Sequence, residues 1–139
     1  MTKVGSAELS FLFLPSHLED VNISYEAKQK LNGATTMFIT YDPEDRFVRA
    51  IAEAEYDIST LSFNAFKIDS ILSYTKESEY KRPVVTCDMD NDFPALYFRT
   101  GNTTGIYADG NCVVLEGVSE NSFYVLRDRL LYQLAGIME

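Results

Sequence analysis

The sequence is short of the side chains on which most catalytic and metal sites depend. Its 139 residues include one histidine, His17, and two cysteines, Cys87 and Cys112, which stand outside any metal-binding or redox spacing. A Ser-His-Asp triad, a Cys-His pair or a multi-histidine metal site would have to be built around that single imidazole. No phosphate loop ending in Gly-Lys-Ser or Gly-Lys-Thr is present. We therefore predict no catalytic residue, no metal site and no cofactor.

Basic residues are also scarce. Lys and Arg together number 12 against 21 Asp and Glu, which gives a net charge of -9. Nonspecific affinity for nucleic acid depends on neutralising phosphates with Lys and Arg, so a surface of this charge repels a phosphate backbone. The composition disfavours a DNA- or RNA-binding protein and favours a protein partner.

Long hydrophobic runs are absent as well. The longest run near the start, residues 11–14, ends at Pro15 and is shorter than a membrane span or the apolar part of a signal peptide. The sequence therefore predicts no membrane segment and a cytoplasmic location. In that reducing compartment we expect Cys87 and Cys112 to be two buried thiols, with a disulfide between them as the alternative.

Apolar and aromatic side chains are plentiful, at 46% and 13% of the residues, and the length suits one domain. Residues 1–139 are therefore predicted to form a single α+β domain. Apolar periodicity and capping residues predict its elements. The predicted strands cover residues 7–14, 35–41, 46–57, 84–89, 95–100, 104–108 and 112–116, and the predicted helices cover 25–31, 65–75 and a final segment after Ser119. The Asp109-Gly110 pair is the sharpest hairpin signal.

The two halves of the chain, residues 1–76 and 77–139, resemble each other in the order of these segments. Gly-Ala-Thr-Thr at 33–36 recurs as Gly-Asn-Thr-Thr at 101–104, and each precedes a predicted hairpin and an amphipathic helix. An internal duplication of β-β-α units is one explanation, and chance similarity between short hairpins is the other. The predicted fold is a mainly antiparallel sheet with two amphipathic helices on one face, which leaves the opposite face to water or a partner.

The final predicted helix is apolar on more than one side. Tyr124 and Tyr132 lie off its inward stripe, and Leu131 extends this second face. Together with Arg127 they have the composition of an interface centre, so we predict that a protein partner or a second copy of the chain binds there. Tyr97, on a predicted strand, is a further candidate contact. A helix wedged between the sheet and loops would show the same pattern, and this alternative stays open.

Three carboxylates alternate along the chain at Asp88, Asp90 and Asp92. The spacing is that of a calcium loop, but Phe93 takes the position of the turn glycine and Arg99 that of the bidentate glutamate, which excludes the site. On a strand, the alternation would place all three on one face. They form either a solvated strand edge or an acidic patch that contacts a partner, and a divalent-metal enzyme built on them is the least favoured function.

The segments Phe-Pro-Ala-Leu-Tyr-Phe-Arg at 93–99, Thr-Thr-Gly-Ile-Tyr at 103–107 and Asp-Gly-Asn-Cys-Val-Val-Leu-Glu-Gly at 109–117 precede the final helix. Residues 93–135 thereby resemble one repeat of the TATA-binding-protein family. In that family two such repeats make a saddle whose concave sheet contacts the DNA minor groove and whose helices contact protein, so the resemblance implies a pseudo-twofold sheet with helices on one side. Asn111 stands where that family has Lys, so DNA binding is not implied. Through Phe-Asn-Ala-Phe-Lys-Ile-Asp-Ser-Ile-Leu at 63–72 and Asp-Phe-Pro-Ala-Leu at 92–96, residues 57–107 more weakly resemble a half-domain of the sliding clamps.

These observations favour a non-enzymatic regulatory or adaptor module that acts by protein-protein contact, through the open sheet face or the final helix. A nucleic-acid-associated protein, similar to the TATA-binding protein or to a clamp, is the second hypothesis. It would need the basic residues gathered on one face despite the overall charge, namely Arg46, Arg49, Lys81, Arg82 and Arg99.

Overall fold

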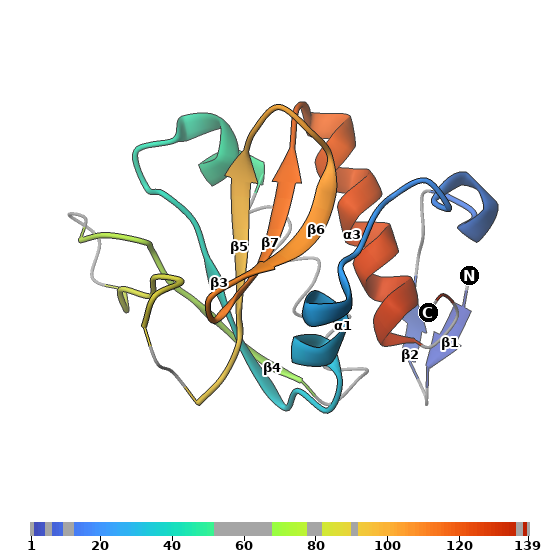
Figure 1. Cartoon of the computed structure of the whole chain (residues 1–139), viewed down its shortest axis with the longest axis horizontal. Helices are drawn as coiled ribbons and strands as arrows, with labels where there is room; N and C mark the ends of the chain where they lie inside the picture. Colours follow the sequence, from blue (N-terminus) through green and yellow to red (C-terminus); the bar gives the residue numbers. More distant parts are fainter. Residues whose placement is uncertain are drawn as a thin grey trace.

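Five strands form one sheet that is parallel over most of its width, with the helices on one face (Figure 1). The computed structural model describes residues 2–4, 7–9, 13–51, 68–77, 82–89, 92–135 and 138. In spatial order the strands are β4 (Asp69–Leu72), β3 (Thr36–Thr40), β5 (Ala95–Thr100), β7 (Cys112–Gly117) and β6 (Gly105–Asp109). The helices are α1 (Tyr25–Leu31), α3 (Glu120–Leu134), a 3-10 turn over Pro15–His17 and a helical segment at 46–51, and β1 (Thr2–Val4) pairs with β2 (Ala7–Leu9) in a separate sheet.

Strand direction is the main difference from the sequence prediction. β4, β3, β5 and β7 all run parallel, and β6 alone is antiparallel, to β7. The α+β combination of helices and a sheet is confirmed, whereas the mainly antiparallel sheet is wrong. The prediction extended one hairpin signal to the whole sheet, although a hairpin determines only the pairing of the two strands that it joins.

The two faces of the sheet are covered differently. On the first face Val113 and Leu115 of β7 belong to the main core, together with α1, α3 and the helical segment 46–51. On the second face Cys112 and Val114 pack with Val85, which lies in the loop segment 82–89. The loop covers the beginning of β7, and no helix among the described residues covers this face.

Several local predictions are confirmed. The helix predicted at 25–31 is α1, and its cap is Ser24, whose Oγ accepts a hydrogen bond from the Ala27 amide at 3.2 Å. β5 has its predicted bounds, and Asp109-Gly110 leads from β6 into β7. Ser119 caps α3 by accepting from the Ser122 amide at 3.3 Å.

Three other predicted elements differ in the structure. Residues 46–51 are helical, where the second arm of a hairpin was expected, because Asp45 acts as an N-cap and accepts from the Val48 amide at 3.1 Å. β4 lies within the helix predicted at 65–75. The segment 84–89 is a loop with a turn, in which only Val84 makes an isolated bridge, to Tyr74.

The internal duplication is not seen in the described residues. The second half contains the β6–β7 hairpin followed by α3. In the first half β3 leads into the helical segment 46–51 and pairs with no adjacent hairpin strand. Residues 52–67, most of the part of the first half that would correspond to the second hairpin arm and the helix, lie outside the described residues. The recurring Gly-x-Thr-Thr sequence precedes a strand in each half, β3 and β6.

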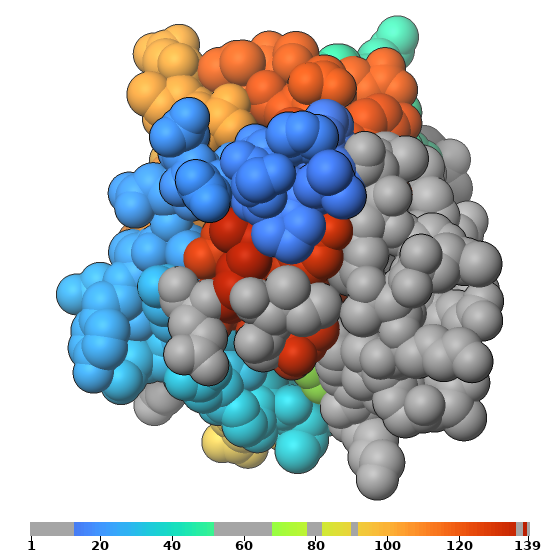
Figure 2. Space-filling view, turned by 90° about the vertical axis from the view of Figure 1, so that its right-hand side faces the viewer, coloured from blue at the N-terminus to red at the C-terminus, as the bar shows by residue number. Residues whose placement is uncertain are grey.

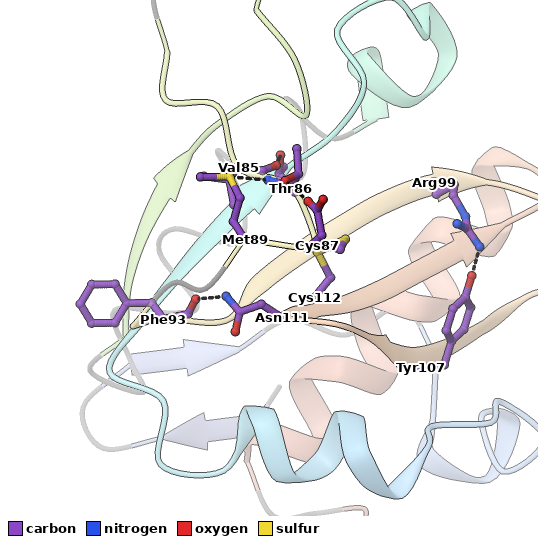
Figure 3. Close-up of a disulfide and its surroundings, with 11 residues drawn as sticks. Val85, Thr86, Cys87, Met89, Phe93, Arg99, Tyr107, Asn111 and Cys112 are labelled. Atoms are coloured by element: carbon purple, nitrogen blue, oxygen red, sulfur yellow. Dashed lines mark hydrogen bonds between the residues drawn. A yellow bond between two sulfur atoms is a disulfide. The ribbon is translucent and has the colours of Figure 1, made fainter.

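Cys87 and Cys112 form a disulfide that ties the loop segment 82–89 to the start of β7, with their Cα atoms 5.0 Å apart (Figure 3). The prediction of two free thiols is wrong, because it followed from the expected compartment and could not see that the loop lies against β7. None of the helices in the described part of the chain is long and apolar enough to cross a membrane.

Reduction of this disulfide is expected to destabilise the fold. The bond joins two cysteines with a sequence separation of 25 residues. A crosslink of that span lowers the entropy of the unfolded chain and thereby raises the free energy of unfolding by about 3 kcal/mol. Urea unfolding with and without a reductant should show this loss. The double variant Cys87→Ser, Cys112→Ser should have the lower stability and be insensitive to reductant; equal stability of wild type in both conditions would contradict the crosslink.

Candidate functional site

The outer side of α3, which the sequence indicated as an interface, is covered by the chain itself. Leu131 and Tyr132 are 2% and 4% exposed. The Tyr132 hydroxyl donates to the carbonyl oxygen of Phe13 at 2.7 Å, and the Phe13 amide donates to Asp128 at 2.9 Å. Figure 2 shows the N-terminal segment, in blue, lying across α3, in red. The second apolar side of α3 is therefore a core contact, which is the alternative that the sequence left open.

Two further predicted contacts on α3 are engaged within the helix. Arg127 is buried and pairs with the adjacent Asp128, with 3.1 Å between the guanidinium and carboxylate atoms. Its guanidinium also lies 5.6 Å from the ring centroid of Tyr124, which is half-buried and donates to Glu120 at 2.9 Å. These contacts fix both side chains, and Tyr124 alone among the four helix candidates keeps part of its surface.

The second face of the sheet carries a polar cluster where the loop cover ends. Tyr97 and Arg99 project from β5, Tyr107 from β6 and Glu116 from β7, because alternate residues of neighbouring strands share a face. We call these four residues the Arg99 cluster. Figure 3 shows Arg99 and Tyr107 reaching toward each other from their two strands. All four side chains are partly exposed.

Glu116 is the centre of this cluster. It accepts from Arg99 Nη2 at 2.8 Å, from the Tyr107 hydroxyl at 2.9 Å and from the Thr103 hydroxyl at 2.8 Å, and Arg99 also donates to the Tyr107 hydroxyl. These donors, Arg99 first, lower the pKa of Glu116 from 4.5 to about 2. A Cβ atom at Gly101 would overlap the Glu116 side chain, so this glycine makes room for the carboxylate.

The aromatic members of the cluster are held by the same arginine. The Arg99 guanidinium lies 5.9 Å from the ring centroid of Tyr97 and 5.6 Å from that of Tyr107. Burial raises the pKa of both phenols, so both hydroxyls remain protonated donors near neutral pH. The cluster therefore presents two fixed aromatic rings beside a neutralised ion pair.

A hollow of about 370 Å³ adjoins the cluster at Tyr97. Its walls include Thr86, Cys87 and Asp88 from the loop, and Tyr97, Asp109 and Gly110 from the sheet. We call it the Tyr97 hollow. The loop and the hairpin meet closely here, because the Asn111 amide donates to the Cys87 carbonyl oxygen at 2.8 Å. Gly110 has φ +56°, and a Cβ at this position would overlap the same carbonyl oxygen.

The predicted acidic patch is only partly described. Asp88 is exposed on a turn, where its carboxylate accepts from the Thr86 hydroxyl at 2.5 Å, and Asp92 is exposed farther along. Asp90 lies outside the described residues. Because residues 87–89 do not form a strand, the alternation cannot place these carboxylates on one strand face. No group of three or more metal-binding side chains occurs among the described residues.

The basic residues required by the nucleic-acid hypothesis have different surroundings. Arg99 is bonded to Glu116, and Arg82 lies 5.3 Å from the ring centroid of Tyr74. Arg46 is exposed and Arg49 half-buried on the helical segment 46–51, while Lys81 lies outside the described residues. Lys76 lies in the segment that follows β4 and pairs with Glu44 at 2.7 Å and with Asp42 at 3.4 Å.

Of the residues proposed from sequence, Tyr97 and Asp88 come together at the hollow. Tyr107 and Glu116 were not identified as site residues, and Arg99 was named only as one of the basic residues that the nucleic-acid hypothesis requires. Each lies on a strand at alternate spacing from a residue of the same face, but their grouping depends on β7 lying between β5 and β6. Comparisons with protein-family models, with curated proteins and with solved structures found no match.

Acid should weaken the fold through Glu116. The pKa of Glu116 is about 2 in the folded protein and lies below its ordinary value of 4.5. The ionised carboxylate therefore stabilises the fold fully above about pH 4.5, and this stabilisation is lost as the pH falls toward 2. Glu116→Gln should lower the free energy of unfolding by about 1 to 2 kcal/mol at neutral pH and flatten the profile between pH 4.5 and 2. Urea unfolding across this range is the measurement. The exposed Glu19→Gln is the control, and an unchanged profile in Glu116→Gln would contradict the assignment.

Gly110 and Gly33 form a matched pair for testing the contact between loop and hairpin. Both have positive φ, +56° and +73°, so alanine at either site costs about 1 kcal/mol in backbone strain. Only at Gly110 does the new Cβ overlap a backbone atom, whereas Gly33 has nothing within 4 Å. We expect Gly110→Ala to lose at least about 2 kcal/mol more than Gly33→Ala in thermal or urea unfolding. Equal losses would show that the loop does not rest on Gly110.

Proposed function

We propose that this protein is a non-enzymatic adaptor or regulatory module that binds a protein partner through the Arg99 cluster. The observation that carries the proposal is a pair of fixed tyrosines and an arginine, partly exposed, on the sheet face that no described helix covers. Tyr and Arg are enriched at interface hot spots, where rigid aromatic rings give contact area at little entropic cost.

Preorganisation supports this use of the cluster. The hydrogen bonds to Glu116 fix Arg99 and Tyr107 before any partner arrives, so little side-chain freedom remains to be lost on binding. The cluster also lies near the carboxyl ends of the parallel strands β5 and β7, and open parallel sheets bind their ligands at that edge.

The charge of the chain favours a basic partner surface. With a net charge of -9, long-range attraction speeds encounter with a positively charged protein and disfavours nucleic acid. A cytoplasmic location and the likeness to the TATA-binding-protein family stay predictions. The disulfide bears on the location, because such bonds are usual in oxidising compartments and are often regulatory in reducing ones.

The proposal is tested by comparing two exposed faces. A photo-crosslinking residue in place of Tyr107 should capture a partner, whereas the same residue in place of Tyr25, which is 70% exposed on α1, should not. With the purified partner, Tyr97→Ala should weaken binding at least about tenfold, and Tyr25→Ala should leave it unchanged. Circular dichroism checks the fold of both variants. Loss of binding in Tyr25→Ala alone would place the interface on α1 and refute the proposal.

A further inference from the structure

The Tyr97 hollow has a lining of unusual composition for its size. Asp88 and Asp109 enter it from two different segments, the loop and the end of β6, and both carboxylates are exposed. In the part of the chain that the structure describes, neither is paired with a cation. Tyr97, Thr75 and Thr86 also line the hollow. The hollow therefore combines an aromatic wall, hydroxyl groups and two negative charges.

The nearby cations are occupied elsewhere. Arg99 is paired with Glu116 at 2.8 Å. Lys76 is held by Glu44 and Asp42. Burial raises the pKa of the Tyr97 phenol, the Arg99 guanidinium lowers it, and the carboxylates of Asp42, Asp109 and Asp45 raise it, so charges of both signs act at the ring. A positive group entering the hollow would meet the carboxylates of Asp88 and Asp109, which pair with no cation among the described residues.

We propose that the Tyr97 hollow receives an arginine side chain of the protein partner. A guanidinium is planar and has several N–H donors, so it can bond to Asp88 and Asp109 together while its plane contacts the Tyr97 ring. The volume of about 370 Å³ is within the usual range of binding pockets. This inference rests on the proposed function, and it names the chemistry by which the partner is recognised.

The hollow is rigid enough to act as a preformed site. The disulfide and the hydrogen bond from the Asn111 amide to the Cys87 carbonyl oxygen hold the loop wall against the hairpin wall. Val85, two residues before Cys87, is tied to the sheet because its carbonyl oxygen accepts from the Thr40 hydroxyl at 2.9 Å. The backbone that carries Asp88 is therefore held against the hairpin that carries Asp109 before a ligand enters.

The test uses a pair of peptides that differ in charge and not in shape. Acetyl-Gly-Arg-Gly-amide carries the guanidinium, and acetyl-Gly-citrulline-Gly-amide is its neutral analogue. Titrated at millimolar concentration into the ¹⁵N-labelled chain at low salt, the arginine peptide should shift the amide signals of Thr86, Asp88, Tyr97 and Asp109. The citrulline peptide should not. Equal shifts with both peptides, or shifts outside the hollow only, would overturn the proposal.

Two conservative variants provide the control. Asp88→Asn keeps an oxygen for the Thr86 hydroxyl, and Asp109→Asn keeps a residue that the hairpin turn accepts, so both should fold. The double variant should bind the arginine peptide about tenfold more weakly than the wild type does. The variant Asp92→Asn, at an exposed residue outside the hollow, should bind the peptide as the wild type does. In the partner assay, binding that needs Tyr97 but tolerates the double variant would refute the arginine site and leave the proposed function standing.

Discussion

The complete burial of β7 is the constraint on which the rest of the structure depends. Residues 112–115 are 0% exposed, so this strand must be covered on both faces and paired at both edges. The helices cover its first face, and the loop with Val85 and Cys87 covers the second. The loop cover ends before Glu116, the first residue of β7 whose side chain reaches the surface. The Arg99 cluster therefore begins where the second layer stops.

Local chemistry was enough to predict the elements that local chemistry determines. The Ser119 cap, the Asp109-Gly110 hairpin and the bounds of α1 all follow from residues within one or two turns of the chain. Strand direction does not. The unbroken apolar run at 112–115 is typical of a strand buried on both faces, as parallel sheets require, and it was the available evidence against an antiparallel sheet. The pairing of β7 with β5, its contact with the loop and the disulfide all join residues that are far apart in the sequence. Local patterns do not determine such contacts.

The candidate site was predictable to the same extent. Tyr97 could be placed on an open strand face from its alternation with Phe98, whereas its grouping with Tyr107 and Glu116 required the strand order. The pattern on α3 misled for a different reason. Leu131 packs in the main core, and Tyr132 is covered by the N-terminal segment at Phe13. An amphipathic pattern cannot distinguish burial by the same chain from burial by a partner.

The electrostatics of the Arg99 cluster favour recognition over proton-transfer catalysis. A general base works best when its pKa lies near the operating pH, and Glu116, with a pKa of about 2, accepts protons too weakly for that role at neutral pH. The same hydrogen bonds that lower its pKa hold Arg99 against the two tyrosine rings. The hydrogen bonds to Glu116 thus hold the side chains of the Arg99 cluster in one arrangement. In the proposed function, the fixed cluster would recognise a partner by shape and the acidic hollow beside it would recognise the partner by charge.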